Sequence, residues 1–177
     1  MTRPATNGPA PDSRQLRHAL GRFTTGVTIV SCCDADGGFV GLTVNSFSSL
    51  SLDPPLVLWA LREASFHLDA FTRARSFAVN VLSLAQVDLS RRFASSQVHR
   101  FASTDWTLGE HGAPVLAGCA AVFECATVSH QDEGDHRLFI GRVLACSDTK
   151  APPLLCQAGH YRQLGDLVAP GLALGHF

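Results

Sequence analysis

One segment of the chain concentrates hydroxyl and amide side chains. Between Gly41 and Ser51, nine successive positions contain Thr43, Asn45, Ser46, Ser48, Ser49 and Ser51. Hydroxyl groups together with free backbone N–H groups at the end of a strand can hold a phosphate without a basic surface. A serine-rich surface loop is the other interpretation of this composition. The segment is therefore one candidate for a binding site.

Two further positions join an imidazole to a turn or an aromatic ring. His136 follows Gly134 and Asp135 at the start of a predicted strand, where a side chain can project over the mouth of a barrel, although an ordinary turn histidine is the alternative. His160 and Tyr161 follow Gly159 near the C-terminal end, where a surface loop and a ring-stacking site explain the pair equally well. These positions are candidate contacts for a flat ligand.

Several common reaction centres have no signature in this sequence. Neither G-x-G-x-x-G nor G-x-x-x-x-G-K-[ST] occurs, which disfavours Rossmann and P-loop nucleotide sites. The absence of G-x-S-x-G leaves no marked nucleophile. Eight histidines and six cysteines are scattered without H-E-x-x-H or C-x-x-C, so no metal site is expected. No catalytic side chain is predicted.

Composition limits the class of protein and its partners. The 177 residues correspond to one domain. A net charge of -1, with both signs spread along the chain, gives no basic patch for nucleic acid. The longest uncharged stretch, Gly37 to Leu52, contains too many hydroxyl groups for a membrane helix. Residues 1–12 contain no apolar signal segment, so a cytoplasmic protein is expected. The cysteines form no disulfide or zinc pattern, which favours buried reduced thiols. Only 16% of residues are charged, which is little for the surface of a monomer.

The elements that must position these residues are mostly strands. Residues 1–12 are predicted as a loose leader and 168–177 as a tail, with the domain over 13–167. Asp12 or Ser13 can cap a first helix that Gly21 ends. Hydrophobic periodicity predicts two further helices, over Ser65–Arg75 and Leu84–Ser95. The hydroxyl-rich segment Ser46–Leu52, which two prolines follow, is predicted as a loop. The predicted strands cover Thr24–Ser31, Phe39–Asn45, Leu56–Leu61, Phe77–Leu82, Ala120–Ser129 and Arg137–Cys146.

This order of elements favours a mainly β fold. Strands and helices do not alternate as they do in a doubly wound sheet, and no internal repeat is present. A turn at 131–135 joins the last two strands, and Gly141 within the second predicts a bulge. A closed antiparallel barrel with a few peripheral helices is therefore expected.

Six segments in a fixed order resemble the short-chain flavin reductase family. They cover about residues 13–165, and the order is more specific than any single segment. The family consists of FMN-binding split barrels that serve as reductase components of two-component flavin-dependent monooxygenases. The segments are Gly21–Val30 (GRFTTGVTIV), Gly41–Ser46 (GLTVNS), Ser51–Val57 (SLDPPLV), Phe77–Leu82 (FAVNVL), Gly134–His136 with Leu138–Gly141 (GDH, LFIG), and His160–Tyr161.

The resemblance implies a fold, a reaction and a set of contacts. The fold is a dimeric split antiparallel β-barrel that binds FMN or FAD and reduces it with NADH or NADPH. The implied contacts to the isoalloxazine edge and ribityl chain are Thr43, Val44, Asn45, Ser46, Phe47 and Ser49. Those on the phosphate side are Ala64, Ser65 and Phe66 at a helix start, with Arg100 and Phe101. Asn80 is implied to line the site, and His136 with Gly159, His160, Tyr161 and Arg162 to lie beside the nicotinamide.

The hypotheses differ in whether the protein catalyses a reaction. The first is an NAD(P)H:flavin oxidoreductase that supplies reduced flavin to a separate monooxygenase or halogenase. The second is a non-catalytic barrel that holds FMN tightly. A third is a barrel resembling pyridoxamine-phosphate oxidase, or one that binds another cofactor. Hydride transfer between a nicotinamide and a flavin requires stacked rings but no catalytic dyad, which agrees with this sequence.

Overall fold

A seven-stranded antiparallel sheet forms the body of the protein. The computed structural model describes residues 12–96, 99–166 and 168. The strands lie in the order β3-β2-β6-β9-β10-β5-β4. Their bounds are β2 (Thr28–Cys33), β3 (Phe39–Val44), β4 (Ser48–Leu52), β5 (Pro55–Arg62), β6 (Ser76–Val81), β9 (Ala121–Glu133) and β10 (His136–Asp148).

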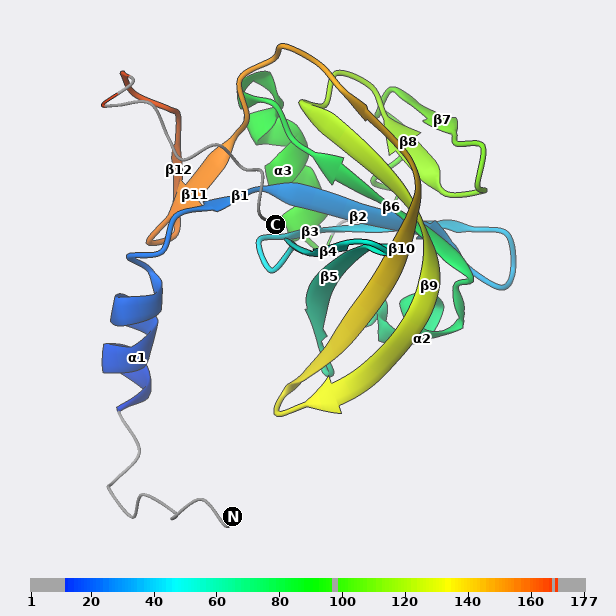
Figure 1. Cartoon of the computed structure of the whole chain (residues 1–177), viewed down its shortest axis with the longest axis horizontal. Coiled ribbons are helices and arrows are strands. Elements are labelled where there is room, and N and C mark those ends of the chain that lie inside the picture. Colours follow the sequence, from blue (N-terminus) through cyan, green and yellow to red (C-terminus); the bar gives the residue numbers. More distant parts are fainter. Residues whose placement is uncertain (1–11, 97–98, 167, 169–177) are drawn as a thin grey trace.

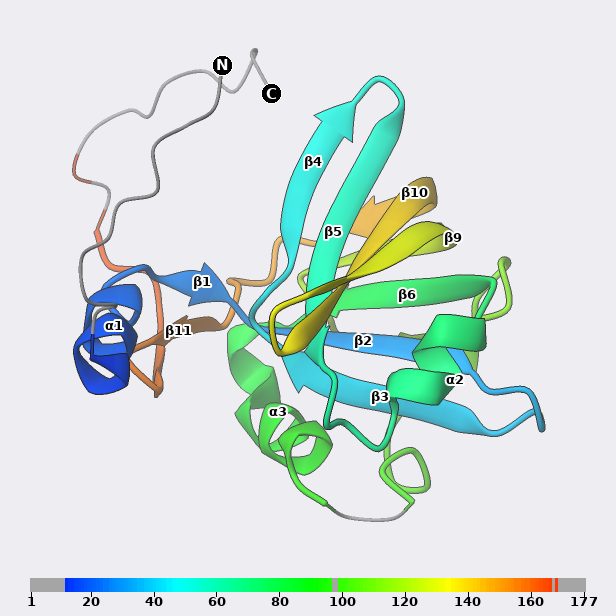
Figure 2. The ribbon, with the colours of Figure 1, turned by 90° about the horizontal axis from the view of Figure 1, so that it is seen from below.

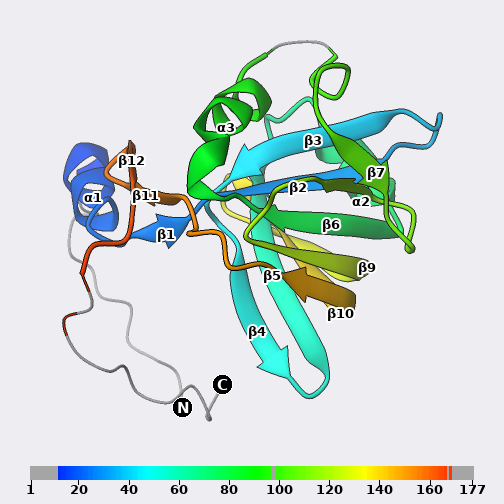
Figure 3. The same cartoon turned by 90° about the horizontal axis from the view of Figure 1, so that it is seen from above.

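The sheet curls into a split barrel. Its two outermost strands, β3 and β4, are consecutive in the chain and are joined by residues 45–47. The β4–β5 hairpin stands at a steep angle to β2, β3 and β6 (Figures 2 and 3). The expected mainly β architecture is confirmed, and residues 45–47 lie where the sheet turns from one part of the barrel to the other.

Alternating side chains fill the barrel. Along β5, Val57, Trp59 and Leu61 point inward and are buried, as the two-residue period of a strand requires. Trp59 stacks on Phe139 of β10 with ring centroids 4.6 Å apart. Burial of aromatic side chains of this size contributes several kcal/mol of hydrophobic stabilisation.

A second core lies on the outer face of β2. This strand is buried on both faces, because Val30 packs into the barrel while Ile29 joins a separate cluster. That cluster includes Phe93 of helix α3 (Val87–Ala94), which follows the 3₁₀ turn η1 (Leu84–Gln86) and packs on β2 and β3. The small sheet of β7 (Trp106–Leu108) and β8 (Pro114–Leu116) contributes Leu116. Helix α3 is thereby fixed against β2 and β3.

A three-stranded sheet lies to one side of the barrel beside α1 (Ser13–Leu20) (Figure 1). It contains β1 (Thr25–Gly26), β11 (Leu155–Gln157) and β12 (His160–Arg162). Asp12 caps α1 by accepting a hydrogen bond from the backbone N–H of Arg14, and Gly21 ends it, as predicted. The predicted leader and tail lie outside the described residues except for Asp12 and Val168.

Three predicted boundaries are wrong. The predicted loop at 46–52 contains strand β4, whose partner is β5 in a hairpin with Asp53 and Pro54 at its turn. The helix predicted over 65–75 is only α2 (Leu68–Arg73), because Ala64–His67 form turns instead. Strands β9 and β10 extend into the predicted turn and leave Gly134 and Asp135 to make it.

Two smaller predictions have clear outcomes. The bulge predicted at Gly141 is present as a register shift between Ile140 and Gly141 in the β9–β10 ladder. All six cysteines are free thiols; Cys32, Cys119 and Cys125 are buried, whereas Cys146 is exposed. Across the described part of the chain, no helix combines the length and the apolar character needed to span a membrane.

Candidate functional site

Three neighbouring hollows follow strand β3 and the turn after it. We call them the central, arginine and tyrosine hollows. The central hollow, about 410 Å³, is lined by Leu42–Ser46, Ala60–Arg62, Ala64, Ser65 and His136. The arginine hollow, about 380 Å³, is lined by Phe39–Gly41, His67 and His99–Ala102. The tyrosine hollow, about 320 Å³, is lined by Val27, Thr43–Asn45, Ser90, Cys156, Gly159 and Tyr161.

Hydrogen bonds fix the shape of the central hollow. The hydroxyl of Ser46 donates to the carbonyl oxygen of Ala60 at 2.8 Å and accepts from its N–H at 3.0 Å. This pair locks the turn after β3 onto β5 and uses the Ser46 hydroxyl internally. Asn45 is exposed, and its side-chain amide has no hydrogen-bond partner among the described residues. That amide is therefore available to a ligand.

Two polar groups face the hollow from the other elements. His136, at the start of β10, has Nδ1 2.7 Å from Oδ1 of Asp135, and this hydrogen bond lowers the pKa of the exposed aspartate. When Nδ1–H donates to the carboxylate, Nε2 is left to meet a ligand. Ser65 accepts a hydrogen bond from the N–H of His67 at 3.3 Å and so shapes the turn that separates the central hollow from the arginine hollow.

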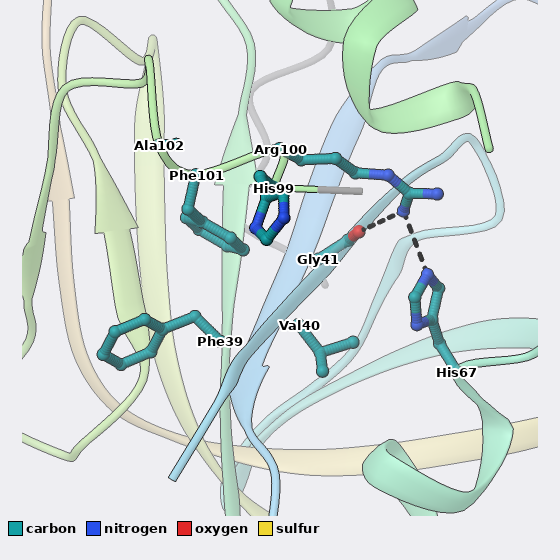
Figure 4. A pocket seen from close by; sticks show the side chains of 8 residues that line it. All are labelled: Phe39, Val40, Gly41, His67, His99, Arg100, Phe101 and Ala102. Carbon is teal, nitrogen blue, oxygen red and sulfur yellow. Dashed lines mark hydrogen bonds between the residues drawn. The ribbon is translucent and has the colours of Figure 1, made fainter. Parts of the chain in front are cut away.

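Arg100 spans the arginine hollow. Its Nη1 donates to the carbonyl oxygen of Gly41 at 2.8 Å and lies 3.0 Å from Nε2 of His67 (Figure 4). Its Nη2 donates to the carbonyl oxygen of Ser95. A guanidinium can only donate, so Nε2 of His67 must accept. Burial, and next the charge of Arg100, lower the pKa of His67. The pair therefore presents one cation beside a neutral imidazole.

Aromatic rings close the same hollow. Phe101 packs edge-on against Phe93 with centroids 5.0 Å apart, and Phe39 lies 6.1 Å from Phe101. Gly41 is required between them, because a Cβ there would approach the Phe93 ring to 2.8 Å. A cationic group next to aromatic walls suits a phosphate joined to a flat ring.

The tyrosine hollow brings β12 to β3. Tyr161 lies 2.9 Å from the hydroxyl of Ser90 on α3, and the Thr43 hydroxyl donates to the Ser90 carbonyl oxygen at 2.7 Å. Thr43, Val44 and Asn45 line both this hollow and the central one. The two hollows therefore meet at the end of β3.

Most residues implied by the resemblance lie at these hollows. The central hollow gathers Thr43, Val44, Asn45, Ser46, Ala64, Ser65 and His136. Arg100 and Phe101 line the arginine hollow, and Gly159 and Tyr161 line the tyrosine hollow. Residues from four other segments thus converge on β3 and the turn after it.

Six of the implied residues lie elsewhere. Asn80 is fully buried in β6 and hydrogen-bonds Ile29, Ser31 and Leu116, so it joins core strands and lines none of the three hollows. Phe47 packs on Phe123, and Ser49 and Phe66 are exposed. His160 is also exposed, with Nδ1 2.9 Å from the carbonyl oxygen of Ala158, and Arg162 lies beside Arg17 and Arg22.

Sequence reasoning missed two residues of the site. His67 pairs with Arg100 across 33 positions and Ser90 with Tyr161 across 71, which no local pattern reveals. The one available signal for Ser90 is its place on the buried face of an amphipathic helix three positions before Phe93.

Comparison with known proteins identifies the family. Residues 20–165 match the profile of the "Flavin reductase like domain" family. The chain belongs to this family. The fold of the chain is similar to that of a solved structure, the NADH:FAD oxidoreductase SgcE6 of Streptomyces globisporus in complex with NAD and FAD fragments. Its TM-score is 0.84 at 37% identity, over 89% of this chain and 96% of that one.

Curated relatives agree with this family. The FMN reductase (NADH) SmoA of Agrobacterium fabrum is 43% identical over 150 residues, 85% of each chain. The flavin-dependent monooxygenase reductase subunit HsaB of Rhodococcus jostii is 41% identical over 158 residues, 89% of this chain and 80% of HsaB. A probable flavin reductase of Rhizobium meliloti is 48% identical over 134 residues; these make up 76% of this chain but only 43% of that longer protein.

Proposed function

We propose that this protein is an NAD(P)H:flavin oxidoreductase that moves a hydride from NADH or NADPH to FMN or FAD. The observation that carries the proposal is the succession of three hollows along β3, in which neighbouring hollows share residues or take adjacent positions of the same segments. A flavin nucleotide with a nicotinamide stacked on its ring needs such an elongated surface. Each hollow also has the volume typical of small-molecule sites, about 300–1,000 Å³.

The residues along β3 fit a flavin nucleotide. The free amide of Asn45 and the backbone N–H groups of the turn at 45–47 are donors for the polar edge of the isoalloxazine ring. Arg100 offers a cation to the phosphate. N–H donors aimed at that edge would stabilise the negative charge of the reduced ring. The two hydrogen bonds between the Ser46 hydroxyl and the backbone of Ala60 keep these donors in place before the ligand arrives.

His136 and Tyr161 serve the nicotinamide side in this proposal. Nε2 of His136 would orient the carboxamide, and the Tyr161 ring would border the slot where the second ring stacks. The bound flavin and nicotinamide nucleotide supply the hydride acceptor and donor. The protein contributes alignment at near-attack distance and exclusion of water, so no side chain need act as acid or base.

We also propose a homodimer that delivers reduced flavin to a separate monooxygenase or halogenase. Several large apolar side chains are exposed in the single chain, including Leu20 at the end of α1, Phe23 after it, Leu52 on β4 and Phe66 before α2. Burial of these side chains in an interface between two copies explains the low charged fraction of 16%. HsaB, a reductase subunit of a monooxygenase, supports the second partner. A cytoplasmic location remains part of the proposal.

Steady-state kinetics test this function. Oxidation of NADH and NADPH by the purified protein should depend on added FMN or FAD, and the flavin and nucleotide with the higher kcat/KM are the preferred pair. No flavin-stimulated oxidation with either nucleotide would refute the proposal. Flavin that stays bound through gel filtration without any turnover would instead identify a non-catalytic flavin-binding barrel.

A further inference from the structure

Ser90 is a fully buried polar residue that lines the tyrosine hollow. It lies on α3, and its relative exposure is 0%. Its hydroxyl contacts the Tyr161 hydroxyl at 2.9 Å, and its backbone carbonyl accepts the Thr43 hydroxyl at 2.7 Å. One residue therefore holds a side chain on each side of the tyrosine hollow, through two different groups.

Two successive residues of α3 hold Tyr161. The Ser90 hydroxyl hydrogen-bonds the phenol hydroxyl of Tyr161, and the Arg91 guanidinium carbon lies 5.7 Å from the ring centroid, within the range of a cation–π contact. Tyr161 itself belongs to β12, in the small sheet beside the barrel. The helix thus fixes a ring that comes from a different sheet and faces the end of β3.

We propose that Ser90 is a positioning residue for the nicotinamide. By holding the phenol of Tyr161, it sets the distance between that ring and the Thr43–Asn45 end of β3, and so the width of the slot in which the nicotinamide stacks. This inference rests on the proposed function. A side chain that is already ordered costs less entropy when a ligand binds, so loss of the hydroxyl contact should weaken nicotinamide binding.

A single substitution can remove one hydrogen bond of Ser90 and keep the other. Ser90→Ala removes the hydroxyl that holds Tyr161 but leaves the backbone carbonyl that holds Thr43. The KM for NADH or NADPH should therefore rise roughly three- to tenfold, the usual effect of one hydrogen bond, while flavin affinity stays unchanged. A role limited to packing of α3 would move both quantities together.

The test uses the bond from both ends. Tyr161→Phe removes the same contact at the other partner, so it should raise the nicotinamide KM by a similar factor, and the double variant should be no worse than either single one. If Ser90→Ala does not fold, Tyr161→Phe alone still tests the contact. Ser31→Ala is the matched control, because Ser31 is equally buried and its hydroxyl bonds Pro114 and Asn80 in the core.

A spectroscopic readout is independent of activity. Tyr161 is the single tyrosine of the chain, so carbon-13 labelling at the ring carbon that bears the hydroxyl gives one NMR signal. Ser90→Ala should shift this signal and Ser31→Ala should not. An unshifted signal, additive effects in the double variant, or equal losses of flavin and nicotinamide affinity would each overturn the role of Ser90. A wild-type protein without flavin-dependent oxidation would overturn the proposed function itself.

Discussion

Arg100 offers the sharpest test of how the site recognises its ligand. If its guanidinium binds the flavin phosphate, replacement by methionine keeps much of the apolar stem and removes the charge. A hydrogen bond to a charged group contributes about 1.5–3 kcal/mol, or roughly 10- to 150-fold in Kd. Arg100 is only half-buried, so solvent screening places the expected loss of FMN affinity near the lower end, about tenfold.

The same substitution also removes internal contacts. Arg100 donates to the carbonyl oxygens of Gly41 and Ser95 and lies within hydrogen-bond distance of His67. Loss of these bonds should lower the free energy of unfolding by about 1–3 kcal/mol. Affinity must therefore be measured at a temperature well below the thermal midpoint of the variant.

Riboflavin, which has the ring and ribityl chain but no phosphate, separates recognition from scaffolding. Fluorescence titrations should show that Arg100→Met weakens FMN and FAD but leaves riboflavin nearly unchanged. Arg92→Met is the matched control, because Arg92 donates to Ser103 and Thr104 near the same loop and lines none of the three hollows. Equal weakening of FMN and riboflavin would refute a phosphate contact and leave Arg100 with a structural role alone.

Three further predictions concern other parts of the site. His136→Ala should raise the KM for the nicotinamide nucleotide about threefold or more and change that for flavin little; the reverse ranking removes His136 from the nicotinamide side. Because burial and then Arg100 lower the pKa of His67, the unfolded state binds more protons below about pH 6.5. The free energy of unfolding should therefore fall as the pH drops through that value, and denaturant titrations of His67→Gln should lack this component. Gly41→Ala should lower the free energy of unfolding by about 1–3 kcal/mol, and with it the midpoint of thermal unfolding, because the added methyl group would meet the Phe93 ring at 2.8 Å. An unchanged midpoint would show that the ring moves freely.

Continuous apolar runs predicted the buried strands. In β5, all six residues of Leu56–Leu61 are apolar, which marked a buried strand, and the structure then buries Val57, Trp59 and Leu61 more deeply than the residues between them. Strand β4 was missed because its serines have no buried face to mark a period. It exists because it pairs with β5 across a hairpin, and that pairing is not encoded in its own side chains.

The differences between the expected residues and those that line the hollows have a related cause. Asn80 was assigned to the site from the resemblance, yet β6 is buried on both faces, so residue parity cannot separate a core position from a lining one. The partners of Asn80 come from β2 and β8, far away in the sequence. His67 and Ser90 were missed for the same reason, since each gains its role from a contact that only the folded chain creates.

A crystal structure of the protein with bound FMN tests the central claim most directly, which is that β3 and its following turn hold the flavin. We expect the isoalloxazine ring in the central hollow with its polar edge toward Asn45, and the phosphate within hydrogen-bond distance of Arg100. A flavin bound elsewhere on the barrel, in crystals of protein that still oxidises NADH in a flavin-dependent manner, would contradict the account.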